Sequence, residues 1–419
     1  MESRWTQLGF LLMALAAAVL LMSAIYPAEP MVDEHFHLGQ IRFINSDEFI
    51  RVPELTTPLG YHYSVALPAR WLGVDSLSGL RAISASLGLL AVLLAWACIR
   101  RSHDDGALMR AFQVLLCPLL WPFYFLLYTD LVSLAVVLCA LLFVLSGRYG
   151  LAAMVGIAML GWRQSNVFWA ALLWLMALHQ AGLGPILGRL FDRNQSVSFA
   201  TLSEGLRESL KATWPLALPL FAFLAFLVLN QGVAMGDRAA HQFGARLYPS
   251  QVFFMLLTVW VVLLPLHLAC LPQIVGLIRR RPIIVLGLTG LFILYMLSFS
   301  VTHFYNLGLP EFHLRNRALG WLNDDYLWRA FGFVGIAWSV LTLAVTRLKT
   351  PAAYWLYPMT LAALLPVELI EQRYYIVPMV FFLLFRDRGR TVTEWSLLAW
   401  FGLLSAALTG AFASQRYFL

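Results

Sequence analysis

The chain has 419 residues, of which 61% are hydrophobic and only 12% are charged. A soluble domain carries about 25% charged residues, so this composition excludes an ordinary soluble protein. The net charge of +7 does not indicate a nucleic-acid partner, because the basic residues lie in short clusters between apolar runs. Cytoplasmic loops of membrane proteins carry lysine and arginine in this way.

Apolar runs of nearly 20 residues recur from end to end, and this is the length that crosses about 30 Å of hydrocarbon. The fold class predicted is therefore all-α, a polytopic transmembrane bundle in the lipid bilayer. We expect about thirteen transmembrane helices, near residues 8–26, 82–99, 111–128, 131–147, 150–162, 167–181, 214–233, 250–272, 283–301, 330–346, 352–369, 374–385 and 395–413.

The stretch 59–74 is apolar but short, and Pro58, Gly60 and Pro68 interrupt it. We interpret it as a juxtamembrane or re-entrant helix within the first external loop, residues 27–81. Counting it as a full span would move the dense clusters Arg279–Arg281 and Arg386–Arg390 to the outside, against the usual distribution of positive charge. The N-terminus is then cytoplasmic, residues 1–419 form one membrane domain, and residues 182–213 form an amphipathic segment on the cytoplasmic surface.

The first external loop carries two adjacent acids, Asp33 and Glu34, flanked by His35 and His37. A carboxylate at the membrane boundary can act as a general base, with its pKa tuned by partial burial. Adjacent residues of a regular helix cannot both point into one pocket, so one acid would do the chemistry and the other would support it. The alternative is a solvated acidic pair that caps a helix. These four residues match no zinc pattern; no metal cofactor is expected, although a divalent ion stays open.

Other polar groups collect on the same predicted side of the membrane. They lie in Tyr128-Thr129-Asp130, Arg163-Gln164-Ser165-Asn166, Gly236-Asp237-Arg238 with His241, the loop 302–329, and Glu371-Gln372-Arg373-Tyr374. Polar groups at the ends of transmembrane helices, within or close to the bilayer, are costly and usually mark a substrate path or a buried pair. Arginines among them can bind phosphate, or can simply reach the membrane interface. Nucleotide-binding loops are absent from the sequence, which favours a lipid-linked donor.

Together these segments resemble a known family. Met31-Val32-Asp33-Glu34-His35-Phe36-His37, followed by Thr56-Thr57-Pro58-Leu59-Gly60, is similar to the first luminal loop of the dolichyl-phosphate-glucose α-1,2-glucosyltransferases, which add the terminal glucose to the lipid-linked oligosaccharide for N-glycosylation. The resemblance continues in order through the later polar segments and ends at Glu371–Pro378. It implies a GT-C glycosyltransferase fold and an inverting transfer of glucose, or a related hexose, from a polyprenyl- or dolichyl-phosphate donor to a glycan or lipid-linked glycan acceptor.

The resemblance also implies roles for individual residues. Asp33 would be the catalytic base, with Glu34 as the second choice. Arg163, Arg238 and Arg373 would hold the phosphate leaving group. Sugar contacts would come from Asn166, Asp237, His241 and Tyr374, and His37 and Asp130 complete the predicted substrate-binding set. The active site would face the lumen of the endoplasmic reticulum in a eukaryote, or the periplasm in a bacterium. The short cytoplasmic loops and the excess of arginine over lysine fit a bacterial homologue at least as well as a eukaryotic one.

Two other functions stay open from the residues alone. A transporter or lipid flippase would also use polar residues and proline-broken helices. Such a protein needs ionisable groups near the bilayer midplane and internal repeats, whereas the charges here gather on one side. A non-catalytic assembly subunit is the third possibility.

Overall fold

The computed structural model describes residues 4–27, 29–46, 50–102, 106–190, 198–237, 246–307 and 316–414. Within these ranges the fold is all-α, as predicted, and the only β-type pairing is an isolated bridge between Leu348 and Arg386. The helices are α1 (Arg4–Ile25), α2 (Glu34–Asn45), α3 (Gly60–Leu72), α4 (Leu77–Arg101), α5 (Ala107–Leu115), α6 (Thr129–Leu145), α7 (Tyr149–Leu160), α8 (Val167–Leu178), α9 (Gly184–Leu190), α10 (Phe199–Thr213), α11 (Leu218–Asn230), α12 (Pro249–Val262), α13 (Leu264–Arg280), α14 (Ile283–Ser298), α15 (Arg317–Asp324), α16 (Tyr326–Val345), α17 (Leu356–Leu364), α18 (Ile376–Phe385) and α19 (Thr391–Ala413).

Several helices are long and apolar enough to cross a bilayer, so this is an integral membrane protein. Within the described residues six helical stretches meet this condition, and α12 with α13 makes a seventh if the bent pair is one span. The helices α6, α7, α14 and α18 are apolar but shorter. The predicted total of thirteen spans is therefore not confirmed.

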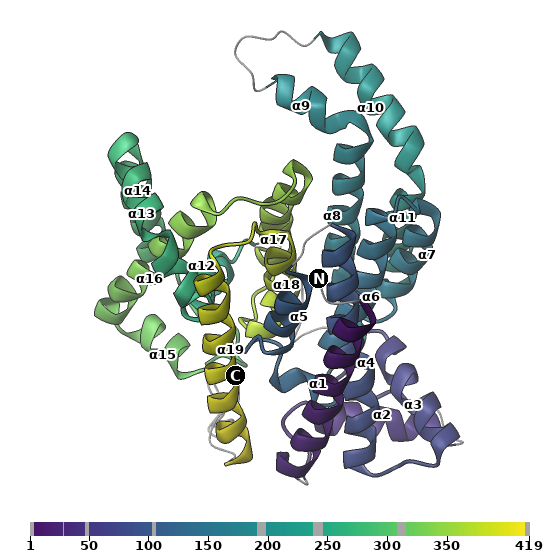
Figure 1. Cartoon of the computed structure of the whole chain (residues 1–419). Helices are drawn as coiled ribbons and strands as arrows, with labels where there is room; N and C mark the ends of the chain where they lie inside the picture. Colours follow the sequence, from purple (N-terminus) through teal and green to yellow (C-terminus); the bar gives the residue numbers. More distant parts are fainter. Residues whose placement is uncertain are drawn as a thin grey trace.

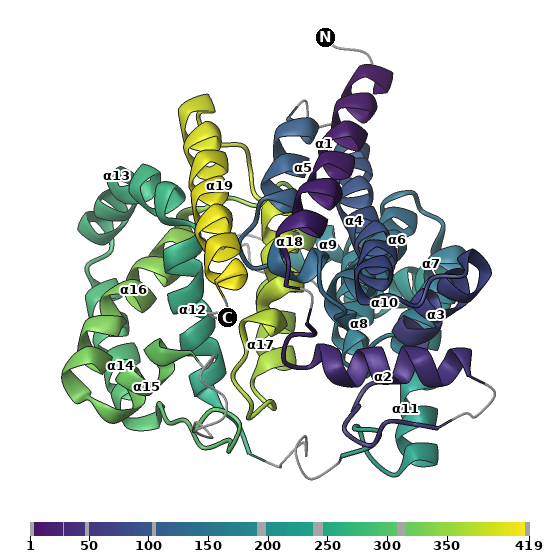
Figure 2. The same ribbon diagram turned by 90° about the horizontal axis from the view of Figure 1, so that it is seen from below.

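The helices form two groups with a third set between them. Figures 1 and 2 show α12–α16 on one side and α4, α6, α7, α8 and α11 on the other, with α5, α17 and α18 between the two groups. Two short helices, α2 and α3, lie at the lower end of Figure 1, and α9 and α10 lie at the upper end. The last two cover the described parts of the segment 182–213, whose residues 191–197 lie outside the described ranges.

Prolines break two helices that the hydropathy pattern joined. The predicted helix 111–128 ends as α5 at Leu115, and the chain then runs through turns and the short 3-10 helix η1 (Pro122–Tyr124) to α6. Pro118 and Pro122 explain this, because proline lacks the N–H that a helix needs. The predicted helix 250–272 is instead two helices, α12 and α13, which meet at Leu263 with a bend of 97°. Pro265 lies in the first turn of α13, a position where proline is well tolerated.

The described part of residues 27–81, predicted to form the first external loop, folds into a platform at one end of the helices (Figure 1). The expected short helix at 59–74 is present as α3, and a second helix that was not predicted, α2, packs against it. Leu38 and Ile41 of α2 share a buried cluster with Tyr61 and Val65 of α3 and with Leu127. This packing holds the beginning of α2, where the acidic pair lies, against the start of α6.

Gly60 joins this platform to the loop between α7 and α8. Its N–H donates to the carbonyl oxygen of Gly161 at 2.9 Å. A Cβ atom at position 60 would lie 2.4 Å from the same oxygen, so only glycine allows this approach.

A buried polar network anchors the opposite end of α18. Arg386 pairs with Glu394 of α19, and Gln113 of α5 hydrogen-bonds to both. Arg110 of α5 donates to the carbonyl oxygens of Leu383, in the last turn of α18, and of Arg386, the residue that follows this helix. Because α18 follows directly on residues 371–375, this network fixes the helix whose other end reaches the candidate site.

Candidate active site

A cavity of about 960 Å³ opens beside the platform. Its walls come from segments that are far apart in the sequence: the start of α2, residues 54–57, the start of α6, residues 163–166, residues 302–306 and residues 363–377. Cavities of this size suit a small ligand or the polar part of a larger one. Four of the five polar segments selected from the sequence therefore line a single space, and residues 308–315 of the loop 302–329 lie outside the described ranges.

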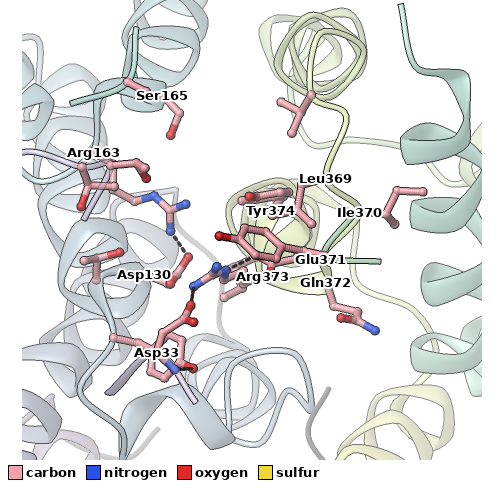
Figure 3. Close-up of a pocket in the computed structure, with 18 of the residues that line it drawn as sticks. Asp33, Asp130, Arg163, Ser165, Leu369, Ile370, Glu371, Gln372, Arg373 and Tyr374 are labelled. Atoms are coloured by element: carbon pink, nitrogen blue, oxygen red, sulfur yellow. Dashed lines mark hydrogen bonds and ion pairs between the residues drawn. The ribbon is translucent and has the colours of Figure 1, made fainter. Parts of the chain in front are cut away.

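Asp33 is the residue immediately before α2, at its N-terminal end, and lines the cavity. Its side chain is 35% exposed, and its Oδ2 atom is 3.1 Å from Nη1 of Arg373. The backbone N–H of Asp33 donates to the hydroxyl oxygen of Tyr128, whose ring also packs 5.6 Å from the Arg373 guanidinium. Figure 3 shows Arg373 pointing toward Asp33 across the cavity.

Arg373 lies between two carboxylates. It pairs with Asp33 through Nη1 and with Glu371 through Nε. Burial raises the pKa of Glu371 above its usual range, the arginine opposes this shift, and the nearby Asp33 charge adds to it. An arginine shared by two acids keeps donors that can turn to a third anion, such as a phosphate.

A second ion pair lies on the facing wall. Arg163 pairs with Asp130, which is in the first turn of α6, and the carboxylate of Asp130 is almost fully buried. The Arg163 guanidinium also lies 5.9 Å from the centre of the Tyr374 ring, a cation–π distance that links it to the opposite wall. In Figure 3 the side chain of Arg163 points to Asp130, and Arg373 reaches toward Asp33 from the side of Glu371 and Tyr374.

Glu34 does not line the cavity. It is fully buried, and Arg81 of α4 donates to both of its oxygens. The backbone N–H groups of Met31 and Leu127 donate to the same carboxylate. These four bonds join α4 and the start of α6 to the loop that carries Asp33. The geometry therefore separates the acidic pair, with Asp33 toward the cavity and Glu34 in the protein interior.

Three of the predicted substrate-binding residues that line the cavity differ in whether their polar atoms already have hydrogen-bond partners. Asn166 reaches the cavity wall, but its amide nitrogen donates to the Ser133 hydroxyl at 2.8 Å and to the Met159 carbonyl oxygen at 2.7 Å. His37 lines the cavity and pairs with His62 of α3 at 2.9 Å between Nδ1 and Nε2. Tyr374 lines the cavity through its ring.

The segment around Asp237 packs next to the cavity without lining it at that residue. The Asp237 N–H donates to the carbonyl oxygen of Pro53, and Gly236 has φ +75°. A Cβ atom on Gly236 would lie 2.4 Å from the Pro53 carbonyl oxygen, so the close approach needs glycine. Arg238 and His241, predicted to bind phosphate and sugar, lie outside the described residues.

The possible metal ligands of the first loop do not come together. Asp33 faces Arg373, Glu34 is buried against Arg81, and His37 pairs with His62. In the described part of the chain, no three His, Cys, Asp or Glu side chains are grouped to hold a metal ion.

Sequence reasoning missed three contributors to this region: Arg81, His62 and, as a selected site residue, Glu371. Arg81 had a usable signal, because a cation in the first turns of an apolar span demands a buried partner. His62 had none, since it lies in a short segment whose partner is 25 residues away. Glu371 was noticed among the polar groups, but only the structure shows that it shares Arg373 with Asp33.

Comparison with known proteins agrees with the expected family. A family model described as the DIE2/ALG10 family matches residues 27–384. Among curated relatives, a mouse protein named Dol-P-Glc:Glc(2)Man(9)GlcNAc(2)-PP-Dol alpha-1,2-glucosyltransferase is 27% identical, with 87% of this chain and 85% of the relative covered. The human and Arabidopsis thaliana proteins of the same name are each 26% identical, with 85% and 88% of their lengths covered. These relatives are named as transferases, which favours an enzyme over a transporter.

No solved structure matches this chain. The assignment therefore rests on the family model, which covers most of the sequence and includes the segments that build the cavity. The platform formed by α2 and α3, the two arginines Arg163 and Arg373 and the start of α18 all fall within the matched residues. The chain is a member of the DIE2/ALG10 family.

Proposed function

We propose that this protein transfers glucose, or a related hexose, from a polyprenyl- or dolichyl-phosphate carrier to a glycan or lipid-linked glycan. Two facts support the proposal: membership of the family, and a cavity in which the partly exposed Asp33 carboxylate pairs with Arg373 while a second arginine, Arg163, lines the same space. The observation that carries it is the Asp33–Arg373 pair, which places a candidate base next to a candidate phosphate ligand. The relatives' printed names supply the donor and the acceptor, which we extend to this chain.

In the proposed reaction, Asp33 removes the proton from an acceptor hydroxyl as the hydroxyl oxygen attacks C1 of the sugar. The bond between C1 and the phosphate oxygen breaks, and its electron pair leaves with the phosphate. A single displacement of this kind inverts the configuration at C1. Asp33 is preferred to Glu34 because Glu34 has four hydrogen bonds in the interior and does not reach the cavity.

Arg163 and Arg373 would hold the phosphate. Negative charge grows on the leaving phosphate, and fixed guanidinium donors stabilise it best when they are placed before the reaction begins. Both arginines line the cavity and both are held by carboxylates in this structure. A phosphate that binds Arg373 would compete with Asp33 for its N–H groups. Donor binding would therefore release Asp33 from its ion pair and make it a better base.

The cavity is proposed to face the lumen or periplasm. The platform α2–α3, which together with residues 54–57 contributes to the cavity wall, lies at one end of the molecule, and the turns between α13 and α14 and between α18 and α19, predicted to be cytoplasmic, lie toward the other (Figure 1). Excess positive charge marks the cytoplasmic side of membrane proteins. This orientation would give Asp33 access to acceptors made available outside the cytoplasm.

The test is transfer by purified protein from synthetic polyprenyl-phosphate glucose to a lipid-linked glycan, with Asp33→Asn as the key variant. We expect Asp33→Asn to lower kcat by about 100-fold or more, the usual contribution of a general base. The matched control is Glu208→Gln, which neutralises an exposed carboxylate on α10. Full activity of Asp33→Asn would reject the base assignment. A wild type that transfers sugar from no such donor would reject the enzyme itself.

A further inference from the structure

His37 and His62 connect the two helices of the platform at the cavity wall. Nδ1 of His37 lies 2.9 Å from Nε2 of His62, and the rings are 6% and 0% exposed. At this distance one of the two nitrogens must carry a proton and donate it to the other. Which of them donates decides what His37 offers to the cavity.

The environment of His62 selects the donor. Its Nδ1 atom is buried and has no hydrogen-bond partner among the described residues. If His37 donated from Nδ1, a neutral His62 would carry its proton on that isolated nitrogen, and a buried N–H without an acceptor is costly. If His62 donates from Nε2 instead, only a lone pair is left without a partner. The second arrangement is therefore favoured, and His37 accepts at Nδ1.

A neutral His37 that accepts at Nδ1 carries its proton at Nε2. This nitrogen makes no hydrogen bond to any described residue, and His37 lines the cavity. His37 follows Asp33 by four residues, so both lie on the same face at the start of α2. The rings of Tyr61 and Tyr128 each lie 5.7 Å from the His37 ring and fix its orientation.

We propose that the His37–His62 pair is a specificity-determining unit, in which the Nε2–H of His37 donates a hydrogen bond to a sugar hydroxyl of the glycosyl donor. This inference rests on the proposed function and names the part of the substrate that His37 reads. A hydroxyl is favoured over the phosphate because Arg163 and Arg373 already supply charged donors to an anion, whereas His37 is a neutral donor. A site that hydrogen-bonds a substrate hydroxyl strongly rejects an analogue without it.

The surroundings keep this donor neutral. Burial, together with the nearby positive charges of Arg373 and Arg163, lowers the pKa of His37 to about 3. Burial also holds the pKa of His62 well below its usual value, with contributions from His37 and Arg51. The negative charges of Glu34 and Asp130 face the adjoining Tyr61 and contribute to its raised pKa. His37 should therefore offer the same N–H throughout the neutral range.

The first test compares donors that carry glucose with donors that lack one hydroxyl each. We expect wild type to discriminate against one of the deoxy donors, and His37→Phe to lose that discrimination while its kcat/KM for the glucose donor falls by about 10- to 100-fold. His37→Gln keeps an amide donor and should recover part of the activity. An equal loss on all donors with discrimination intact would mean that His37 contacts the phosphate, and would overturn the proposal.

The second test changes the partner of His37. In His62→Glu a carboxylate accepts from Nδ1 of His37, so above the pKa of the imidazolium the only remaining proton stays at Nδ1 and Nε2 becomes an acceptor. Transfer should then fall as the pH rises through the neutral range. His62→Gln is the matched control, because its amide can donate to Nδ1 and preserve the wild-type arrangement. A pH profile of His62→Glu that matches that of His62→Gln would overturn the proposal.

Removal of a distant imidazole provides a further control. His179→Gln, in the π-helical segment between α8 and α9, should leave donor discrimination unchanged. A wild type that transfers no glucose would overturn the proposed function and this inference with it. A wild type that transfers glucose, together with a His37→Phe variant that discriminates as wild type does, would overturn this inference alone.

Discussion

Arg81 and Glu34 form a buried bidentate ion pair that joins the first long membrane helix after the platform to the loop carrying Asp33. The Arg81 Nε atom is 2.9 Å from Oε1 of Glu34, and the two side chains are 8% and 0% exposed. The same guanidinium donates to the carbonyl oxygens of Pro27 and Glu29, so it holds the chain just before α2 as well. Val32, between these contacts and Asp33, has φ +48°, a conformation unusual for a β-branched residue that needs such support.

Arg81→Leu is expected to destabilise the protein strongly. It would leave the Glu34 carboxylate buried without its cation, which costs about 3–5 kcal/mol in comparable cases. The measurement is thermal unfolding in detergent. The double variant Arg81→Leu/Glu34→Gln should recover part of the loss, because the remaining side chain is neutral. If the single variant unfolds at the wild-type temperature, the pair does not support the loop.

Arg373 should matter to both donor binding and chemistry. Arg373→Gln removes the cation next to Asp33 and is expected to lower kcat by about 100-fold and to raise the KM for the donor. Arg373→Lys keeps the charge but loses the planar fork, so it should raise KM with a smaller loss of kcat. The assay is steady-state transfer at varied donor concentration, with Arg207→Gln on α10 as a matched control. If Arg373→Gln and wild type have equal kcat and KM, Arg373 takes no part in donor binding or chemistry.

The pKa of His37 predicts a pH dependence of stability. In the folded protein burial lowers it from 6.5 to about 3. Between these values the unfolded chain binds a proton that the folded protein does not, so the free energy of unfolding falls as the pH falls from 6.5 toward 3. His37→Gln should make this decline shallower in unfolding experiments between pH 4.5 and 7. An identical slope in variant and wild type would show that His37 is not held neutral.

We propose that transfer needs no divalent metal, because Arg163 and Arg373 can supply the positive charge that the leaving phosphate requires. Activity should therefore survive treatment with EDTA followed by dialysis. The measurement is transfer before and after treatment, and after adding back Mg²⁺ or Mn²⁺. A loss that either ion restores would contradict this expectation.

Much of the fold could be predicted from composition because bilayer insertion depends on local apolar length. The length and apolar composition of a run such as Leu77–Arg101 do not depend on its tertiary contacts. In the same way, α3 is too short to span a bilayer in any surroundings. The breaks were less visible. Hydropathy averages over a window, so Pro118 and Pro265 were absorbed into helices that their missing N–H groups interrupt.

The chain's own sequence determined the class of the protein, most of the segments that line the cavity and the acidic pair Asp33–Glu34 as the place to look for a base, because hydropathy and residue chemistry are local properties. Only the tertiary structure turned Asp33 toward the cavity and Glu34 into the interior, since that separation depends on Arg81 and Leu127, which are 47 and 93 residues beyond Glu34. The same holds for the sharing of Arg373 and for the His37–His62 pair. Contacts over such separations arise from packing, which no periodicity in a single sequence records.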